Sequence, residues 1–170
     1  MRRIAPSTSG KIIDSRDVIA RLEELAEERE DLQTSVEEAE GAVTEARDAL
    51  DEAEENADTT ALEAAIAGAE QELDAARERL TDWDSDNDDE LKALLALQDE
   101  AEGYADDWRH GATLIQEDYF PEYCQELLAD IGDLPRNLPD YLVIDWDATA
   151  DNLRADYTSV DFDGTTYLIR

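Results

Sequence analysis

Apolar and small residues recur every three or four positions along residues 15–56, a pattern that predicts one long amphipathic helix. Nearly all the other positions hold Glu, Asp or Arg, and Arg29 alone interrupts the apolar series. The apolar positions are Val18, Leu22, Leu25, Leu32, Val36, Ala39, Val43, Ala46, Leu50 and Ala53. A helix of this length spans about 63 Å. Its apolar stripe is narrow, so we expect a partner helix to cover it.

The partner helix is predicted to begin near Asp58, Thr59 or Thr60, with Glu63 completing a capping box. The short connection makes the return antiparallel. Its apolar positions are Leu62, Ile66, Ala69, Leu73, Ala76, Leu80 and Trp83, followed by Leu91, Leu94, Leu97, Ala101, Tyr104 and Trp108. We therefore predict an antiparallel coiled-coil hairpin over residues 14–110, whose return arm is broken near residues 82–90.

Residues 111–170 have the pattern of a small α+β module. Helices are predicted over residues 118–131 and 145–154, and two β-rich runs flank Asp163-Gly164, the signature of a type I′ turn. A module of roughly 60 residues is small for independent stability. We expect it to form a homodimer or to dock on the base of the hairpin. The predicted fold class is mainly α, a helical hairpin followed by an α+β module that ends in a β-hairpin.

The composition is strongly acidic, with 47 Asp and Glu against 14 Lys and Arg and a formal net charge of −33. Such a chain repels phosphates and anionic lipid surfaces, so we expect no direct binding to nucleic acid or membrane. A basic, nucleic-acid-binding protein is the expected partner. Residues 1–13 differ, with three basic side chains and no acidic one, and are predicted to be a flexible lead-in.

The chain has a single cysteine, Cys124, which excludes an internal disulfide and favours a reducing compartment. No apolar run approaches the roughly 20 residues of a spanning helix, and no apolar signal segment follows Met1. A soluble, cytoplasmic protein is expected, in the cytoplasm of the host cell if the chain is encoded by a phage.

One acidic cluster has the alternating spacing of a calcium-binding loop: Asp82, Asp84, Asp86, Asp88 and Glu90. Asn87, however, stands where such a loop turns at Gly, and Ala93 stands where it needs a bidentate Glu. We interpret the cluster as a solvated break between helices. No metal and no cofactor are expected.

The sequence contains no set of residues typical of an active site. His110 is the only histidine, and Cys124 falls among the apolar positions of a predicted helix, where a buried thiol is expected. There is no glycine-rich phosphate loop and no Gly-x-Ser-x-Gly motif. The protein is therefore predicted not to be an enzyme.

The acidic surface of residues 14–110 has three interpretations. An ordinary coiled-coil exterior mixes acids with bases, but this region carries 34 acidic and eight basic side chains. Adaptation to high salt is the second, consistent with only two lysines in the chain. The third is DNA mimicry, because carboxylates three or four residues apart on a helix lie about 5–6 Å from one another, close to the spacing of phosphates. The carboxylates predicted to replace phosphates are Glu23, Glu27, Glu30, Glu37, Glu40, Asp48, Asp51, Glu55, Glu70, Asp74, Glu78, Asp99, Glu102 and Asp106.

The C-terminal third resembles a known family. The segments Asp118-Tyr119-Phe120 to Gly132, Ile144-Asp145-Trp146 and Asp156 to Gly164 with Tyr167 are similar to a region of phage and mobile-element antirestriction proteins of the ArdA type. That resemblance, over about 60 residues, implies an acidic DNA mimic, often dimeric, that occupies the DNA-binding site of type I restriction-modification enzymes. It implies no catalytic residues. The family does not in general begin with a long helical hairpin, so the target could also be another defence complex such as a CRISPR effector.

The sequence thus favours a non-enzymatic, DNA-mimicking inhibitor of a nuclease, methyltransferase or CRISPR effector subunit. The alternative is a structural or assembly coiled coil of a halophile or its virus, whose acidity serves solvation only.

Overall fold

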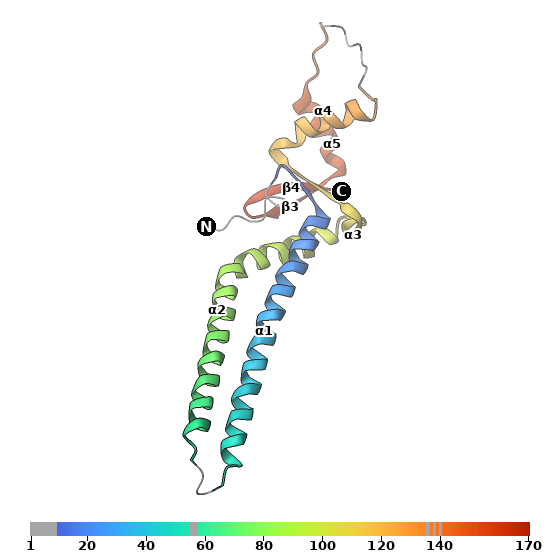
Figure 1. The fold of residues 1–170 in the computed structure, drawn as a ribbon. Coiled ribbons are helices and arrows are strands. Elements are labelled where there is room, and N and C mark those ends of the chain that lie inside the picture. The colour runs from blue at the N-terminus through green and yellow to red at the C-terminus, as the bar shows by residue number, and fades with distance from the viewer. Residues whose placement is uncertain (1–9, 55–57, 135–136, 138, 140) are drawn as a thin grey trace. The chain divides into compact units, whose positions relative to one another are not determined.

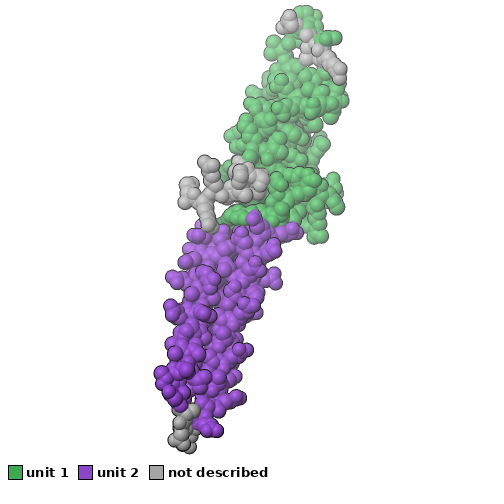
Figure 2. Space-filling view, viewed as in Figure 1, with its two compact units in different colours: residues 1–22, 90–170 green, residues 23–89 purple. Residues whose placement is uncertain are grey.

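We describe the fold from a computed structural model, in residues 10–54, 58–134, 137, 139 and 141–170 (Figure 1). The chain forms two compact units, coloured separately in Figure 2. We call residues 23–89 the hairpin unit, and residues 1–22 with 90–170 the sheet unit. Two long helices, α1 (Ser15–Asp51) and α2 (Thr60–Glu102), contribute to both units. The predicted fold class, mainly helical with a terminal β-hairpin, is confirmed.

The hairpin unit consists of the antiparallel arms of α1 and α2. The predicted apolar positions face the other arm, and Leu25, Val43, Leu73 and Ala76 are the most buried among them. Asp58 caps α2 by accepting hydrogen bonds from the backbone N–H (3.1 Å) and the hydroxyl (2.6 Å) of Thr60. These bonds satisfy a donor that the first turn of a helix leaves unpaired.

The predicted break of the return arm near residues 82–90 is wrong, because α2 continues without interruption through this stretch. Asp, Ser and Asn are poor helix formers, but this stretch makes contacts with α1 and within its own helix. Trp83 Nε1 donates to Glu28 on α1 (2.8 Å), and Arg29 pairs with Asp84. Asn87 is buried and its Nδ2 donates to the carbonyl of Trp83 (2.8 Å). These contacts outweigh a propensity cost of a few tenths of a kcal/mol per residue.

The sheet unit contains a four-stranded antiparallel sheet in the order β1-β2-β4-β3. Its elements are β1 (Ile12–Asp14), α3 (Trp108–Gly111), β2 (Thr113–Gln116), the 3-10 turn η1 (Glu117–Tyr119), α4 (Phe120–Asp130), α5 (Trp146–Leu153), the 3-10 turn η2 (Arg154–Asp156), β3 (Thr158–Phe162) and β4 (Thr165–Ile169). The predicted lead-in therefore ends earlier than residue 13, because Ile12 and Ile13 pair with Ile115 and Leu114 of β2. Residues 1–9 lie outside the described residues.

Both faces of the sheet bury apolar side chains. Ile115 and Leu168 pair across β2 and β4 and pack with Phe120 and Cys124 of α4 and Ala150 of α5. The alternate residues, which include Ile13, Leu114, Val160, Tyr167 and Ile169, are also buried. The unit buries the ends of the long helices as well, at Val18, Leu94, Leu97 and Ala101. The predicted division at residue 110 thus differs from the structure, in which the base of the hairpin belongs to the sheet unit.

Local predictions for the C-terminal elements are confirmed. Asp163 (φ 48°) and Gly164 (φ 74°) form the turn between β3 and β4, with the positive φ values that a type I′ turn requires. Asp145 caps α5 by accepting a hydrogen bond from the backbone N–H of Ala148 (3.0 Å). Within the described residues, no helix is both long and apolar enough to cross a membrane.

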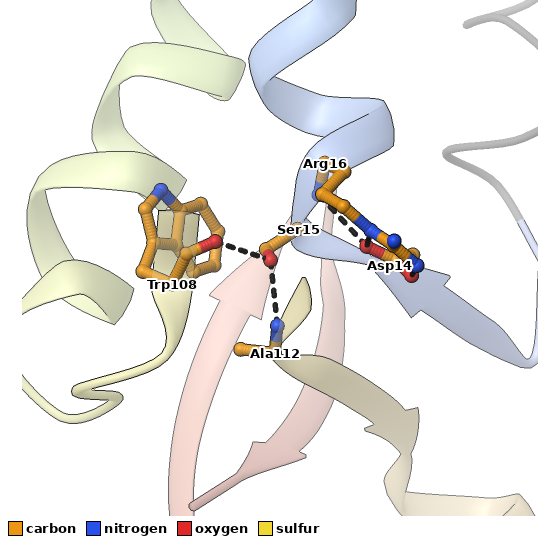
Figure 3. Close-up of polar contacts among 5 residues, drawn as sticks. All are labelled: Asp14, Ser15, Arg16, Trp108 and Ala112. Carbon is orange, nitrogen blue, oxygen red and sulfur yellow. Dashed lines mark hydrogen bonds and ion pairs between the residues drawn. The ribbon is translucent and has the colours of Figure 1, made fainter. Parts of the chain in front are cut away.

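The start of α1 is joined to the segment between α3 and β2 by a buried hydroxyl. Figure 3 shows Ser15 between Trp108 and Ala112, with Asp14 and Arg16 beside it. The Ser15 hydroxyl donates to the carbonyl of Trp108 (2.5 Å) and accepts from the N–H of Ala112 (2.8 Å). The backbone N–H of Ser15 also donates to the carbonyl of Ala112 (2.9 Å). Three hydrogen bonds therefore join the start of α1 to α3 and to the residue that follows it.

Candidate partner-binding surface

Acidic side chains are concentrated in the hairpin unit. Residues 23–89 carry 26 acidic and four basic side chains, a net formal charge of −22. The sheet unit, with 103 residues, carries the remaining −11. The net charge per residue is therefore about three times higher in the hairpin unit. A chain whose acidity served only general solvation would not need such a division.

Three of the four arginines of the hairpin unit pair with acidic side chains of the opposite arm. Arg29 pairs with Asp84 (2.9 Å), Arg47 with Glu70 (2.7 Å) and Arg77 with Glu40 (2.7 Å). As the residue number on α1 rises, its partner's number on α2 falls, as an antiparallel register requires. The fourth, Arg79, donates from Nε to the carbonyl of Ala75 in its own helix (3.1 Å). Arg29, Arg47 and Arg77 thus connect the arms, and through these pairs they neutralise three of the 26 acids.

The predicted carboxylates are exposed wherever the structure describes them, and they are divided between the two units. Glu55 lies outside the described residues, and Asp99, Glu102 and Asp106 belong to the sheet unit. Ten lie in the hairpin unit: Glu23, Glu27, Glu30, Glu37, Glu40, Asp48, Asp51, Glu70, Asp74 and Glu78. Glu40 and Glu70 are partly neutralised by their arginine partners, and in the sheet unit Glu102 lies 3.5 Å from Arg109.

The two flanks of the hairpin seam differ. Helical geometry places Glu40 and Ala42 on opposite sides of the buried Val43. On the flank of Glu40, the Arg47–Glu70 and Arg77–Glu40 pairs bridge the arms. On the flank of Ala42 there is a hollow of about 340 Å³. Sequence reasoning missed this hollow, because the small residues that form it become neighbours only once the register of the arms is known.

The acidic cluster of residues 82–90 does not form a metal site. Successive alternate residues of an α-helix point about 200° apart, so Asp82, Asp84, Asp86, Asp88 and Glu90 are spread around α2. Two of them already have cationic partners, since Asp84 pairs with Arg29 and Glu90 with Arg21 (2.8 Å). Throughout the described part of the chain, no group of three or more His, Cys, Asp or Glu side chains is placed to hold a metal ion.

Cys124 and His110 occupy unrelated environments in the sheet unit. Cys124 is fully buried in the core beneath β2 and β4, and burial raises the pKa of its thiol. This confirms the predicted core thiol. His110 is exposed in the short helix α3. A thiol that is buried and held in its neutral form is a poor nucleophile.

Comparisons with known proteins give no family assignment. No protein-family model matches the chain, and neither a curated protein nor a solved structure does. The function is therefore inferred from the charge and geometry of the hairpin unit.

Proposed function

We propose that this protein is a non-enzymatic inhibitor that mimics DNA, and that the exposed carboxylates of the hairpin unit stand in for phosphates. The observation that carries the proposal is the net charge of −22 on residues 23–89. Three of the four arginines of that unit connect its arms, so they do not form a basic face. The partner is a basic DNA-binding site in a nuclease, methyltransferase or CRISPR effector of the host cytoplasm.

The charge density of the hairpin unit supports this proposal quantitatively. The arm of α1 in this unit, residues 23–51, is about 43 Å long at ~1.5 Å per residue. The two helical arms, residues 23–51 and 60–89, carry 22 acidic and four basic side chains. Their net charge of −18 over that length is roughly one per 2.4 Å. Duplex DNA carries one negative charge per ~1.7 Å of axis and a single strand one per ~3.4 Å. The charge density of the two arms therefore lies between that of a single strand and that of a duplex.

The resemblance of the C-terminal segments to ArdA-type antirestriction proteins supports a restriction-modification enzyme as the target. In this proposal the sheet unit holds the base of the hairpin and serves for dimerisation or docking. No catalytic role is assigned to any residue.

The alternative is a structural coiled coil from a high-salt environment, with acidity that serves only solvation. Such acidity is expected over the whole surface. The threefold higher net charge per residue of the hairpin unit favours mimicry instead.

The test is competition with DNA for a type I restriction-modification enzyme and for a CRISPR effector complex. Binding of a labelled duplex to each enzyme is measured with increasing amounts of the protein, at 0.05–0.3 M salt. One variant neutralises six exposed hairpin carboxylates: E23Q, E27Q, E30Q, E37Q, D74N and E78Q. The matched control neutralises six acids of the sheet unit: D118N, D130N, D133N, D147N, D151N and D156N.

We expect the protein to displace the duplex and the displacement to weaken steeply with salt. The hairpin variant should compete at least about tenfold less well, because electrostatic complementarity is reduced, whereas the control should stay within about twofold. Equal competition by both variants, with both folded by circular dichroism, would refute the proposal. So would failure of the wild-type chain to displace DNA from either enzyme class at low salt.

A further inference from the structure

We infer that the hollow flank of the hairpin unit binds one basic amphipathic α-helix of the target protein, as the major groove of DNA does. This inference rests on the proposed function and specifies the kind of partner. The hollow measures about 340 Å³ and lies between α1 and α2. Its floor is made of Ser35, Ala39 and Ala42 from one arm and Ala75 and Ala76 from the other.

The floor has the composition that close helix packing needs. Packed helices lie 8–10 Å apart, and the smaller distances require small side chains at the contact. Ala42 and Ala75, beside the seam, are exposed and Ala39 of the seam is half-buried, so the apolar floor of the hollow is open to water. A third helix laid along the hollow would cover these side chains.

The walls of the hollow select a cationic helix. Glu38 and Glu72 line it from opposite arms. Asp31 and Glu45 are exposed, seven residues before and after Glu38, and therefore continue the acidic wall along the same side of α1. This acidic ridge on α1, faced by Glu72 across the alanine floor, is an arrangement that a cationic helix fits, as the major groove admits an α-helix beside rows of phosphates.

The opposite flank does not offer this arrangement. There the Arg47–Glu70 and Arg77–Glu40 pairs bridge the two arms and place cations over the seam. A helix laid there would lie over two ion pairs that join the arms, whereas in the hollow Arg79 is hydrogen-bonded within its own helix. The binding site is therefore one-sided, which separates it from simple attraction by the net charge.

Arg79 allows a test of whether the partner helix is cationic, because this arginine lines the hollow and carries a positive charge. Its Nε is hydrogen-bonded to the carbonyl of Ala75, so the charge is held beside the floor. A cationic partner helix is repelled there. Removal of this charge is expected to strengthen binding, the reverse of its effect on an acidic or neutral partner.

The experiment uses the full-length chain and a fluorescein-labelled, 16-residue synthetic helix with a Leu/Ala stripe flanked by lysines. A peptide of identical composition, permuted to remove the apolar stripe, is the control ligand. A42L with A75L fills the hollow, and A64L with A67L makes the same change at exposed alanines of α2 that do not line it. R79Q is the third variant. Dissociation constants are measured by fluorescence anisotropy at 0.05 and 0.15 M salt, with folding checked by circular dichroism.

The amphipathic peptide should bind at least about tenfold more tightly than the permuted one, because only it can bury its stripe. A42L/A75L should weaken binding about tenfold, A64L/A67L should change it by less than twofold, and R79Q should strengthen it severalfold. Equal affinities for the two peptides, or for the filled and control variants, would overturn the helix site. If the six-carboxylate variant still loses its competition with DNA in that case, mimicry stands and only the helix site is lost. If the six-carboxylate variant competes normally while A42L/A75L blocks the peptide, the helix site stands and the proposed mimicry is lost.

Discussion

Ser15 donates a hydrogen bond from its buried hydroxyl to the carbonyl of Trp108, 93 positions further along the chain. The same oxygen accepts a hydrogen bond from the N–H of Ala112. One small side chain therefore satisfies two backbone groups where α1 begins and α3 ends. A buried backbone group without a partner costs about 1–3 kcal/mol, so this contact is a sensitive point of the fold.

We predict that Ser15→Ala lowers the free energy of unfolding by about 2–4 kcal/mol, because it leaves both backbone groups unpaired. Urea unfolding followed by circular dichroism measures the change. Ser35→Ala is the control, since the Ser35 hydroxyl bonds the carbonyl of Asp31 in its own exposed turn, and should change stability by less than about 0.5 kcal/mol. Equal changes in the free energy of unfolding at the two positions would show that the Ser15 contact does not contribute specially to stability.

Two glycines should respond to alanine with opposite signs. Gly111 has φ +115°, and a Cβ there would lie 3.0 Å from Nε of Arg16. Gly111→Ala is therefore expected to destabilise the fold by more than about 1 kcal/mol. Gly41 lies in the exposed middle of α1, where a Cβ would meet nothing within 4 Å beyond the backbone of its own helix, so Gly41→Ala should stabilise by about 0.5–1 kcal/mol. Thermal unfolding of both variants measures the change in melting temperature. Two changes of the same sign would contradict the prediction.

The ion pairs between α1 and α2 should differ in strength according to burial. The side chains of Arg21 and Glu90 are 19% and 13% exposed, whereas those of Arg47 and Glu70 are 61% and 47% exposed. A double-mutant cycle with Arg21→Met and Glu90→Gln should give a coupling energy of about 1–3 kcal/mol. The same cycle with Arg47→Met and Glu70→Gln should give about 0.2–1 kcal/mol, because solvent screens the exposed pair. Couplings of equal size would show that burial does not decide the strength of these pairs.

Alkaline unfolding should depend on Tyr157. Burial raises the pKa of its phenol from 10.0 to about 12, and the ring packs edge-on against Phe120 at 4.9 Å. Because the pKa is higher in the folded chain, the neutral phenol stabilises the fold fully below pH 10, and this contribution is lost as the pH rises from 10 towards 12. The urea midpoint should therefore fall over that range, and fall less in Tyr157→Phe. Tyr141→Phe, at a side chain that is 82% exposed, should follow the wild type.

Elements with a local sequence signal could be predicted, and those that depend on distant partners could not. The seam of the hairpin follows from 3-4 spacing, and the β3–β4 turn follows from Asp163-Gly164. By contrast, β1 and β2 were missed because Ile12-Ile13 and Leu114-Ile115 are runs of two apolar residues, whose pairing joins segments about 100 residues apart. The false break near residues 82–90 has the same origin, since helix propensity is local whereas Arg29–Asp84 is a tertiary pair.

The candidate surface, too, could be predicted from the sequence only where the signal is local. Exposure of the acidic positions could be predicted from their place off the seam. The pairing of Glu40 and Glu70 with arginines could not, because it requires the register of the two arms. The hollow beside Ala42 and Ala75 depends on that register too. Small residues at Ser35 and Ala42, seven positions apart on one flank of the seam, were the signal that could have indicated it.

The salt dependence of stability distinguishes mimicry from adaptation to high salt. The hairpin unit holds a net charge of −22, of which the pairs Arg29–Asp84, Arg47–Glu70 and Arg77–Glu40 offset little, so repulsion opposes folding at low salt. Its apolar seam and capped helices should nevertheless keep it folded there. Screening lengths fall from about 30 Å at 0.01 M to about 3 Å at 1 M salt, so we expect the melting temperature to rise between these limits and then level off. The six-carboxylate hairpin variant should show a smaller rise in melting temperature, because less repulsion remains to be screened.

Thermal melts at 0.01, 0.1, 0.5 and 2 M KCl measure this salt dependence. A chain that is unfolded below molar KCl would favour the solvation alternative, because an inhibitor of DNA binding must fold at salt concentrations where its target still binds DNA.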